Sequence, residues 1–322
     1  MTTPQHKIGS GFGATSTAAE VLTGIDLTGK LALVTGGYSG LGLETTRALT
    51  EAGAHVVVPA RRRSTAVSAL DGMTGVEVDE LDLADLDSVR GFADRFVASG
   101  RRIDLFIGSA GIMAAPETRV GPGWEAQFAT NHLGHFALVN RLWPAIADGA
   151  RVVSVSSRGH HFSGIRWDDL QFEHGYDKWL AYGQAKTANV LFAVHLDALA
   201  RDRVRAFALH PGRILTPLLR HIDEQEMRDR GMIDADGNIV GDWKNVEQGA
   251  ATQVWAATSP QLDGMGGVYL EDCDIADPAP PTQTTPANIS VSLGVRDYAI
   301  DPAEATRLWH LSATLTGENA FA

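Results

Sequence analysis

Short apolar runs rich in β-branched residues recur along the chain, with helical segments between them. Several runs are apolar at consecutive positions, as expected for strands that are covered on both faces. This alternation indicates repeated β-α-β units, and right-handed connections between parallel strands then give a doubly wound sheet. We therefore predict a single α/β domain with helices on both faces and about seven strands, at residues 31–35, 55–59, 76–81, 103–107, 151–155, 204–209 and 267–270.

Other parts of the sequence lack this alternation. Residues 1–25 are rich in Gly, Ser and Thr, and we interpret them as an N-terminal arm ahead of one domain at 26–322. Within that domain, 211–245 carries a charged helix-like segment and an Asp-rich turn, which predict a flap over the sheet. A proline-rich stretch at 277–286 leads to a last helix, predicted at about 302–315.

The charge and cysteine content exclude several classes of partner. The chain has 27 Lys and Arg against 39 Asp and Glu, a net charge of -12, so no excess of positive charge attracts nucleic acid or an anionic membrane. Its one cysteine, Cys273, permits neither an intramolecular disulfide nor a multi-thiolate metal site. No segment approaches the roughly 18 uninterrupted apolar residues of a spanning helix, and we predict a cytoplasmic protein without an integral membrane segment.

A glycine-rich turn directly follows the first predicted strand. Gly36, Gly40 and Gly42 permit a tight turn, and the helix predicted at 43–50 places free N–H groups beside it. An ordinary turn would look the same in isolation, but its place after the first strand favours a dinucleotide pyrophosphate site. The turn lacks the Gly-Lys-Ser/Thr ending of an ATP-binding P-loop, which argues against a kinase.

Tyr182 and Lys186 are four residues apart in a long helical pattern, so they lie on one face of the helix. A phenol titrates near ~10, and a neighbouring ammonium is a physical means of lowering its pKa. The alternative is a surface tyrosine and lysine at helical spacing. Ser157 favours a reactive site, because a hydroxyl at the carboxyl end of the strand at 151–155 reaches the crevice of the glycine turn.

Asn131 opens a helical segment after the strand at 103–107, where either a functional role or helix capping explains it. Histidines also gather near these motifs, but no carboxylate or cysteine accompanies them at helix-ligand spacing. We therefore predict no metal site among His132, His135, His160, His161 and His210.

In chain order, the motifs TGGYSGLG, NHLGHF, VSVSS, YGQAK and HPGRILT resemble the short-chain dehydrogenase/reductases, over about residues 20–320. The stretches AAEVLTGIDLTGKLALVTGG and EQGAATQVWAATSPQLDGMGGVYL are similar to the retinol-dehydrogenase and WW-domain-containing-oxidoreductase branch. The resemblance implies a Rossmann fold in which 26–322 is the catalytic domain and 211–245 the substrate flap. It also implies hydride transfer between a nicotinamide cofactor, NADP or NAD, and a small carbonyl or alcohol substrate.

The resemblance further implies roles for single residues. Tyr182 would be the general acid/base, Lys186 would bind the nicotinamide ribose and acidify Tyr182, Ser157 would polarise the substrate oxygen, and Asn131 would support a proton relay through water. Gly36, Gly40 and Gly42 would hold the pyrophosphate. The full expected cofactor set, besides Tyr182 and Lys186, is Gly36, Tyr38, Ser39, Gly40, Leu41, Gly42, Arg61, Arg62, Asp82, Leu83, Ala110, Gly111, Pro211, Gly212 and Thr216.

The sequence departs from the family pattern at one place and leaves rival functions open. The family's Asn-Asn-Ala-Gly is Gly-Ser-Ala-Gly at 108–111, which predicts a backbone with fewer bracing hydrogen bonds there. An epimerase or dehydratase, or a cofactor-binding scaffold, would use the same fold, although Ser157, Tyr182 and Lys186 are all intact. By resemblance, the helices of Asn131 and Tyr182 would pack against a two-fold partner in a homo-oligomer.

Two further features concern specificity. Aromatic residues at 159–180 predict an apolar substrate, although they would equally serve to pack this insertion onto the domain; they are Phe162, Trp167, Phe172, Tyr176 and Trp179. After the second predicted strand, Ala60 stands where a ribose-binding carboxylate is expected, and Arg61 and Arg62 follow. Arginine there accommodates a 2′-phosphate, which predicts a preference for NADP; a solvated basic turn is the alternative.

Overall fold

A computed structural model gives the structure of the chain and describes residues 3–201, 203–280 and 293–322. An eight-stranded sheet forms its centre, in the order β10-β9-β8-β7-β4-β1-β2-β3, and all neighbours are parallel except β9 and β10. The strands are β1 (Leu31–Thr35), β2 (His55–Ala60), β3 (Val76–Glu80), β4 (Ile103–Gly108), β7 (Ile146–Val155), β8 (Arg205–His210), β9 (Val268–Glu271) and β10 (Asp274–Ile275).

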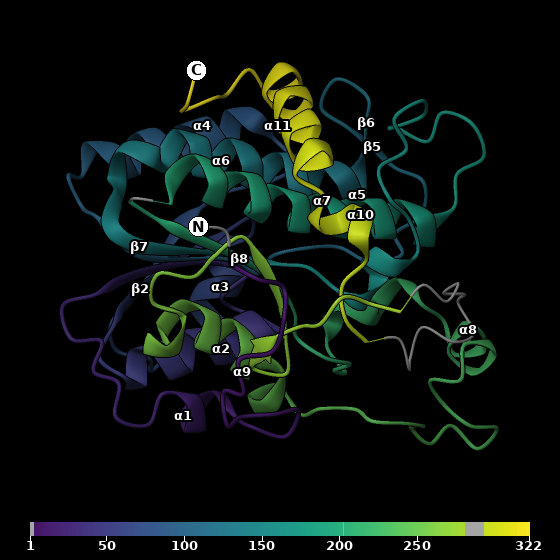
Figure 1. Cartoon of the computed structure of the whole chain (residues 1–322), viewed down its shortest axis with the longest axis horizontal. Coiled ribbons are helices and arrows are strands. Elements are labelled where there is room, and N and C mark those ends of the chain that lie inside the picture. The colour runs from purple at the N-terminus through teal and green to yellow at the C-terminus, as the bar shows by residue number, and fades with distance from the viewer. Residues whose placement is uncertain (1–2, 202, 281–292) are drawn as a thin grey trace.

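Helices cover both faces of the sheet (Figure 1). One face carries α1 (Ala18–Val21), α2 (Gly40–Glu51) and α9 (Val246–Thr258), and α3 (Arg63–Ala69) packs beside β2 and β3. The opposite face carries α4 (Leu86–Ala98), α6 (Gly134–Leu142) and α7 (Lys178–Ala200), with α11 (Pro302–Thr316) packed outside them. The predicted doubly wound α/β fold is therefore confirmed, and each face has its own apolar core.

The order of the strands determines where a ligand can bind. β1 pairs with β2 on one side and with β4 on the other, so the winding of the sheet reverses between β1 and β4. In open parallel sheets, ligands bind at such a reversal, outside the carboxyl ends of the strands. Thr35 and Gly108, which end β1 and β4, are paired with each other at this point.

The predicted strands agree with the observed ones, and the structure adds three. β10 is a short antiparallel strand at the edge of the sheet, and β5 (Arg119–Val120) pairs with β6 (Trp124–Glu125) in a separate hairpin. Two-residue strands are too short for hydrophobic periodicity to reveal. β7 also begins earlier than predicted, at Ile146, because the β4–β7 pairing shifts register between Ile103 and Leu105.

The N-terminal arm lies against the edge of the sheet. The Gln5 side chain donates to the carbonyls of Tyr269 and Ala276 at 2.8 and 2.6 Å, and the Asp274 carboxylate accepts from the backbone of residues 8–10. Val21 of α1 is buried in the core. The arm is thus attached by hydrogen bonds of the Gln5 and Asp274 side chains at the β9–β10 end of the sheet.

The surface expected to form a two-fold interface is covered by the chain itself. Trp309 of α11 stacks on Phe192 of α7 with ring centroids 5.9 Å apart, and meets Phe136 of α6 edge-on at 4.8 Å. Leu308 and Ala305 on the same helix are also buried. α11 therefore packs over part of the face of α6 and α7 on which the homo-oligomer prediction relied, and the oligomeric state stays open to measurement.

The flap prediction at 211–245 corresponds to an irregular segment with little regular structure. It contains a 3-10 turn, η4 (Pro217–His221), and the short helix α8 (Glu224–Asp229), and the Asp234 carboxylate closes the Asp-rich turn by accepting from the backbone of Asp236 and Asn238. The proline-rich stretch continues from 277 to 280, and its part from 281 to 286 lies outside the described residues.

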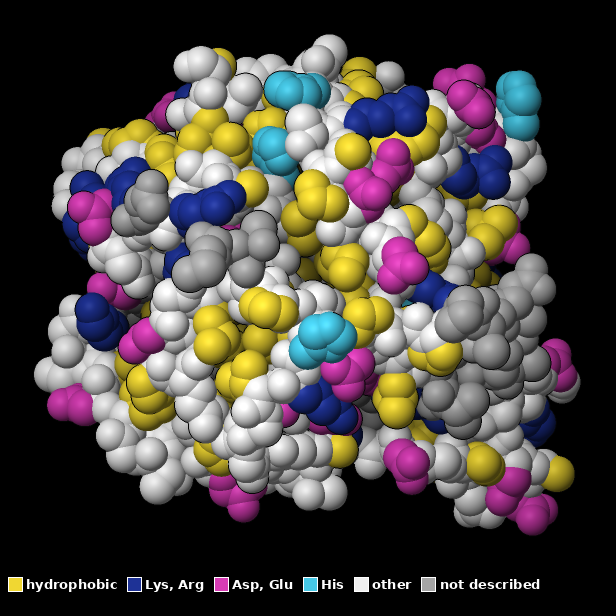
Figure 2. All heavy atoms as spheres, viewed as in Figure 1, with side chains coloured by type: hydrophobic (Ala, Val, Ile, Leu, Met, Phe, Trp, Pro, Cys, Tyr) yellow, Lys and Arg dark blue, Asp and Glu magenta, His cyan; other side chains and the backbone are white. Residues whose placement is uncertain are grey.

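On the face in Figure 2, charged groups of both signs are scattered and apolar side chains gather towards the centre.

Candidate active site

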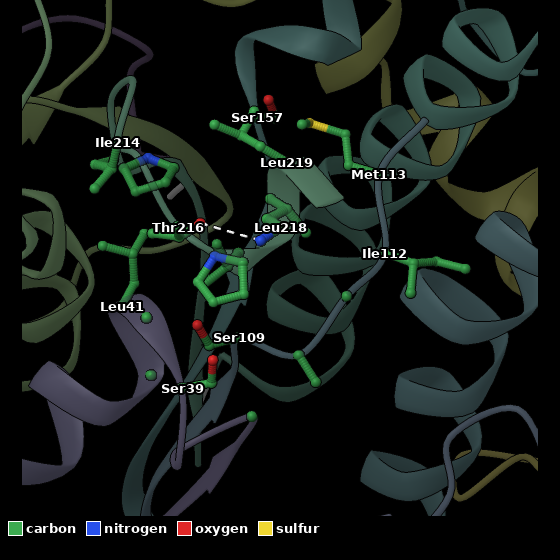
Figure 3. Close-up of a pocket in the computed structure, with 18 of the residues that line it drawn as sticks. Ser39, Leu41, Ser109, Ile112, Met113, Ser157, Ile214, Thr216, Leu218 and Leu219 are labelled. Carbon is green, nitrogen blue, oxygen red and sulfur yellow. Dashed lines mark hydrogen bonds between the residues drawn. The ribbon is translucent and has the colours of Figure 1, made fainter. Parts of the chain in front are cut away.

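One cavity of about 480 Å³ opens at the carboxyl ends of the strands. Its wall includes every residue predicted for catalysis or cofactor binding except Asn131, whose neighbour Thr130 lines it instead. Figure 3 shows Ser39 and Leu41 at one end, Met113 and Ser157 at the other, and Thr216 between them. The cavity thus brings together motifs that lie up to about 180 residues apart in the sequence, from Gly36 to Thr216.

The glycine turn has the geometry that a phosphate cradle needs. Gly36 has a φ of +69°, and a Cβ on it would lie 3.0 Å from the Ala110 backbone, while one on Gly42 would lie 2.2 Å from the Gly36 carbonyl oxygen. Only glycine satisfies both contacts. Ser39 caps α2 without a side-chain hydrogen bond, so the first N–H groups of α2 are open to a ligand in the cavity.

Tyr182 and Ser157 meet at the other end of the cavity. Ser157 lies two residues after the end of β7 and caps the 3-10 turn η3 (Arg158–His161), where its Oγ accepts from the Gly159 N–H at 3.0 Å. Gly159 has no side chain that would separate the two residues, since a Cβ there would lie 2.6 Å from the Tyr182 ring. Ser157 lowers the pKa of the Tyr182 phenol as a hydrogen-bonding neighbour, and both residues line the cavity.

Lys186 is a buried cation one helical turn from Tyr182. Its Nζ donates to the Val155 carbonyl at 2.9 Å and lies 5.7 Å from the centroid of the Tyr182 ring. Among the described residues it has no carboxylate partner, and burial lowers its pKa to about 8. A buried ammonium held only by a carbonyl in a cavity is a mark of a functional site.

The pKa of Tyr182 differs from the expectation. Burial raises it to about 12, against the lowering effect of the hydrogen bond with Ser157. The predicted acidification by Lys186 is thus not seen in this structure, because the ammonium points to Val155 and desolvation of the phenol outweighs any attraction. Protonated tyrosine is the form that donates to a carbonyl oxygen.

Asn131 does not cap a helix. It lies inside a π-helical turn, η1 (Ala129–Leu133), where its Oδ1 accepts from the Ile112 N–H and its Nδ2 donates to the Ile112 carbonyl, both at 2.9 Å. A Cβ on Gly111 would lie 3.1 Å from Asn131 Oδ1 and 3.7 Å from Lys186 Nζ, so all three residues meet. π-Turns within α-helices frequently mark functional sites, and this one places Asn131 beside Lys186.

His135 supplies a brace that the sequence analysis missed. Its Nδ1 lies 3.1 Å from the Asn131 carbonyl, which can only accept, so Nδ1 carries the proton and Nε2 accepts from the Thr35 hydroxyl at 2.8 Å. Thr35 Oγ1 in turn accepts from the Ala110 N–H at 3.0 Å. The prediction of a weakly braced backbone at 108–111 therefore needs correction.

The space for this brace comes from the same departure from the family pattern. A Cβ on Gly108 would lie 3.1 Å from the His135 ring, so glycine at 108 admits the imidazole. Burial lowers the pKa of His135 to about 4, which keeps it neutral and able to accept from Thr35. The missing asparagines of the sequence motif and the second histidine of NHLGHF were the available signal.

The turn that carries Ser157 is held by a segment near the C-terminus. His160 Nδ1 donates to the Ser157 carbonyl at 2.7 Å, while its Nε2 accepts from the Arg296 N–H at 3.2 Å. Tyr298 of α10 (Asp297–Ile300) donates to the His160 carbonyl at 2.6 Å. The Gly294 carbonyl accepts from the neighbouring His161 at 3.0 Å. Residues 294–298 thus fix the turn after Ser157.

All five histidines considered in the sequence are buried, and burial lowers the pKa of each, for example to about 3 in His132 and His160. No group of three or more metal-ligating residues that could hold an ion occurs in the described ranges. Within those same ranges, no helix is long and apolar enough to cross a membrane. The cytoplasmic location stays a prediction.

The end of the cavity near the glycine turn presents two arginines. Arg61 and Arg62 follow β2, line the cavity and are exposed, and their guanidinium groups make no hydrogen bond or ion pair with any other described residue. Asp82 lines the same end, and its carboxylate accepts from the Ala84 N–H at 2.9 Å. Arg63 begins α3 and lies outside the cavity wall.

The aromatic residues of 159–180 divide between two roles. Phe162 and Trp179 line the cavity beside Tyr182. Trp167 instead donates to Glu304 of α11 at 2.8 Å, Phe172 is buried, and Tyr176 donates to the Ala115 carbonyl at 2.9 Å. The prediction of an aromatic mouth thus applies to two of the five, and packing of the insertion explains the others. Sequence reasoning did not identify Met113, Leu218, Leu219, Met232 or Trp243 in this wall.

This arrangement defines a class of protein: a doubly wound α/β fold with a phosphate cradle at one end of its cavity and a Tyr-Ser-Lys group at the other. A family model for short chain dehydrogenases matches residues 30–227. A "Probable oxidoreductase" of Streptomyces antibioticus is 44% identical over 88% of this chain and 97% of the relative. Retinol dehydrogenase 14 of Homo sapiens is 34% identical over 90% of this chain and 87% of its own.

Solved structures agree. An uncharacterized protein from Mycobacterium paratuberculosis is 34% identical, with a TM-score of 0.71 over 96% of this chain and 99% of that one. The NADP complex of Pseudomonas aeruginosa RhlG is 25% identical, with a TM-score of 0.58 over 76% and 95%. The chain belongs to the short-chain dehydrogenase/reductase family, in its retinol-dehydrogenase-like branch, and is an oxidoreductase of that family.

Proposed function

We propose that this protein reduces an apolar carbonyl compound, or oxidises the matching alcohol, with Tyr182 as general acid/base and NADP(H) as the preferred cofactor. The observation that carries the proposal is the buried Lys186, which has no carboxylate partner among the described residues and lies beside Tyr182, one turn away on α7. A cation is expensive to bury, and an anionic or strongly polar reacting centre is what would offset its cost.

The residues around the cavity fit a dinucleotide. The glycine turn and the N-terminus of α2 would hold the pyrophosphate, and Lys186 would donate to a ribose hydroxyl. Asp82 would contact the adenine and Thr216 the nicotinamide carboxamide, and both residues line the cavity. When bound, a reduced nicotinamide supplies the hydride that adds to the carbonyl carbon of the substrate.

The protein groups then handle the oxygen and its proton. Ser157 donates a hydrogen bond to the substrate oxygen and stabilises the charge that develops on it. Tyr182 transfers its phenolic proton to that oxygen, giving the alcohol and leaving a phenolate. Lys186 stabilises the phenolate, and Asn131, which meets Lys186 beside Gly111, supports the return of a proton through water. Oxidation of an alcohol follows the same steps in reverse.

The apolar character of the substrate is supported by the wall beside Tyr182 and Ser157. Met113 and Phe162 come from the main domain and Leu218, Leu219 and Met232 from the flap, and they cluster around Tyr182 and Trp179. Such a wall favours an alkyl or aryl group next to the reacting carbon. A panel of alkyl and aryl ketones, aldehydes and alcohols, followed by nicotinamide absorbance, tests this; no absorbance change with any of them would contradict the proposal.

The preference for NADP is supported by Arg61 and Arg62, whose guanidinium groups have no partner within the described ranges and line the cavity end where a 2′-phosphate would be placed, and by the absence of a carboxylate at Ala60. A guanidinium makes strong charge-assisted bonds to phosphate. We expect Arg61→Ala to reduce kcat/KM for NADPH about tenfold and to leave kcat/KM for NADH nearly unchanged.

Arg63→Ala is the matched control, because it removes the same charge from the same triplet outside the cavity wall. Its kcat/KM with NADPH should equal that of the parent. Equal kcat/KM values for NADH and NADPH in the parent would contradict the preference. An Arg61→Ala variant with unchanged kcat/KM for NADPH would also contradict it.

A further inference from the structure

Trp179 forms the wall of the cavity next to the proposed chemistry. It lies three residues before Tyr182 on α7, is 8% exposed, and meets the Tyr182 ring edge-on, with centroids 6.4 Å apart and planes at 89°. Phe162 packs on it from the η3 turn at 5.8 Å. The position of this indole therefore determines how much room remains beside the Tyr182 hydroxyl.

Glu226 of the flap helix α8 ties the flap to this part of α7. Its Oε1 accepts from the Trp179 indole N–H at 2.7 Å, and its Oε2 accepts from Lys178 Nζ at 2.5 Å. Partial burial alone would raise the pKa of Glu226, but the hydrogen bonds from Lys178, Trp179 and Arg230 outweigh it and the pKa is lowered. The carboxylate is thus ionised at neutral pH and holds two consecutive residues of α7.

Arg230 completes the attachment from the far end of α8. Its guanidinium carbon lies 3.8 Å from the centroid of the Trp179 ring, and its Nε donates to Glu226 Oε1 at 3.2 Å. One carboxylate oxygen is therefore shared by the indole N–H and the guanidinium that stacks on the same ring. Fixed on its edge and on one face, Trp179 has little freedom to move out of the cavity.

The flap also brings apolar side chains to this part of the cavity. Met227 lies within α8 and Met232 follows it, and together with Ile222, Leu218 and Leu219 they form one apolar cluster with Trp179 and Tyr182. The Glu226 carboxylate pairs with both Lys178 and Arg230, and the group keeps one net positive charge, on the side of Trp179 where Arg230 lines the cavity. Glu226 thus holds against α7 the same segment that supplies these apolar side chains.

We propose that Glu226 is a positioning residue that locks the flap onto α7, and that Trp179, held in this way, sets the upper size of the apolar group next to the reacting carbonyl. This rests on the proposed carbonyl-reductase function. It assigns specificity to a contact between the flap and the catalytic helix, and it predicts that selection for size can be lost without loss of the proton donor.

The test uses NADPH-dependent reduction of phenyl ketones whose alkyl chain grows from methyl to pentyl. In the parent, kcat/KM should fall steeply after a certain chain length. Trp179→Ala should raise the ratio of kcat/KM for pentyl over methyl about tenfold or more, since size discrimination of a methylene or more in an apolar pocket is about 10- to 200-fold. If that variant fails to fold, Trp179→Phe keeps a ring and tests the same ratio.

Glu226→Gln tests the lock. The amide retains one oxygen but loses the charge that holds Lys178 and Arg230, so KM for all the ketones should rise about tenfold with kcat little changed, and the size ratio should shift as in Trp179→Ala. Glu224→Gln is the matched control: it removes the same charge from the same helix, where Glu224 pairs only with Arg228 within α8. It should keep the parent's KM and size ratio.

A readout without substrate separates the two proposals. Limited trypsin digestion of the whole protein, followed by mass spectrometry, measures cleavage in the flap after Arg220, Arg228 or Lys244. Cleavage should be severalfold faster in Glu226→Gln than in Glu224→Gln. A parent that reduces no ketone while the flap responds as described would contradict the proposed function alone. An active parent whose size ratio is unchanged in Trp179→Ala, or whose flap is equally protected in Glu226→Gln, would overturn this inference.

Discussion

The two ends of the cavity are built in different ways. The end near Gly36 is made mostly of backbone at strand ends, where glycines permit contacts as close as the 3.0 Å between the position of a Gly36 Cβ and Ala110. The end near Trp179 is made of side chains from α7, the η3 turn and the flap, joined by one carboxylate. A backbone cradle suits a cofactor that never changes, while a side-chain wall can vary with the substrate.

Tyr182 lies at the junction of the two ends, and its loss should have the largest effect. Tyr182→Phe keeps the ring that packs on Trp179 and removes the proton donor, so kcat should fall by a factor on the order of 10² or more while cofactor affinity changes little. Steady-state kinetics and nucleotide titration measure both. Tyr176→Phe, which removes a partly buried phenol that does not line the cavity, is the control and should stay near the parent rate.

Turnover near the parent value in Tyr182→Phe would show that the proton comes from elsewhere. In that case Tyr182 would not link the two ends of the cavity chemically, and its contact with Ser157 would be structural only.

Burial of the Lys186 ammonium should lower the free energy of unfolding of the protein at neutral pH. Its pKa falls from 10.5 to about 8 on burial, so the folded state holds the proton less tightly than the unfolded state. The full penalty is present below pH 8, roughly 3 kcal/mol, and it disappears as the pH rises from 8 to 10.5. Lys186→Met should therefore be more stable than the parent at pH 7 by up to that amount, while losing turnover.

Urea unfolding of both proteins at pH 7 and at pH 10 measures this difference. The gain in unfolding free energy for Lys186→Met should shrink at the higher pH. A less stable variant at pH 7, or a gain that does not depend on pH, would mean that contacts of the Lys186 ammonium offset its burial.

The brace at the backbone end predicts a smaller effect. Thr35→Val keeps the shape of the side chain but leaves the Ala110 N–H and His135 Nε2 without their partner. Each unpaired buried group costs about 1–3 kcal/mol, and we expect a loss of about 2 kcal/mol in stability and weaker NADPH binding. Thr35→Ser retains the hydroxyl and should bind NADPH like the parent. Equal NADPH affinity in the Val and Ser variants would show that the contact between Thr35 and His135 does not support the cofactor end of the cavity.

The smallest expected change concerns the outer surface. Because α11 covers α6 and α7, the parent should have the mass of one chain, 34.4 kDa, by light scattering. Trp309→Ala loosens that cover and should give association that increases with concentration. A parent that already has the mass of two chains would show that another surface, or a displaced α11, forms the interface.

The sequence predicts the two ends of the cavity unequally, for a physical reason. Gly36, Gly40 and Gly42 are required by backbone geometry next to a strand, so local spacing predicts their role, as it does for Tyr182 and Lys186 on one helix turn. Glu226 and Trp179 are 47 residues apart, and nothing local in either position indicates their contact. The strand pattern likewise predicts the sheet but not β10.

His135 is an intermediate case. It stands in a motif that the sequence analysis singles out, and the loss of side chains at 108–109 indicates that some other group must brace the backbone. The partner could not be inferred, because Thr35 lies 100 residues earlier and approaches only through the pairing of β1 with β4. The pKa of Tyr182 was also beyond prediction, since burial depends on the whole fold.

The contact between residues 294–298 and the Ser157 turn has a consequence for folding during synthesis on the ribosome. The glycine turn, Ser157, Tyr182 and Lys186 are synthesised long before Arg296, so the hydrogen bond from the Arg296 N–H to His160 forms late. Folding from the N-terminus can thus finish most of the sheet while the turn after Ser157 still lacks its anchor. A nascent chain halted before residue 294 would carry all the motifs, but the turn after Ser157 would be held only through Thr187 and His210 among these contacts.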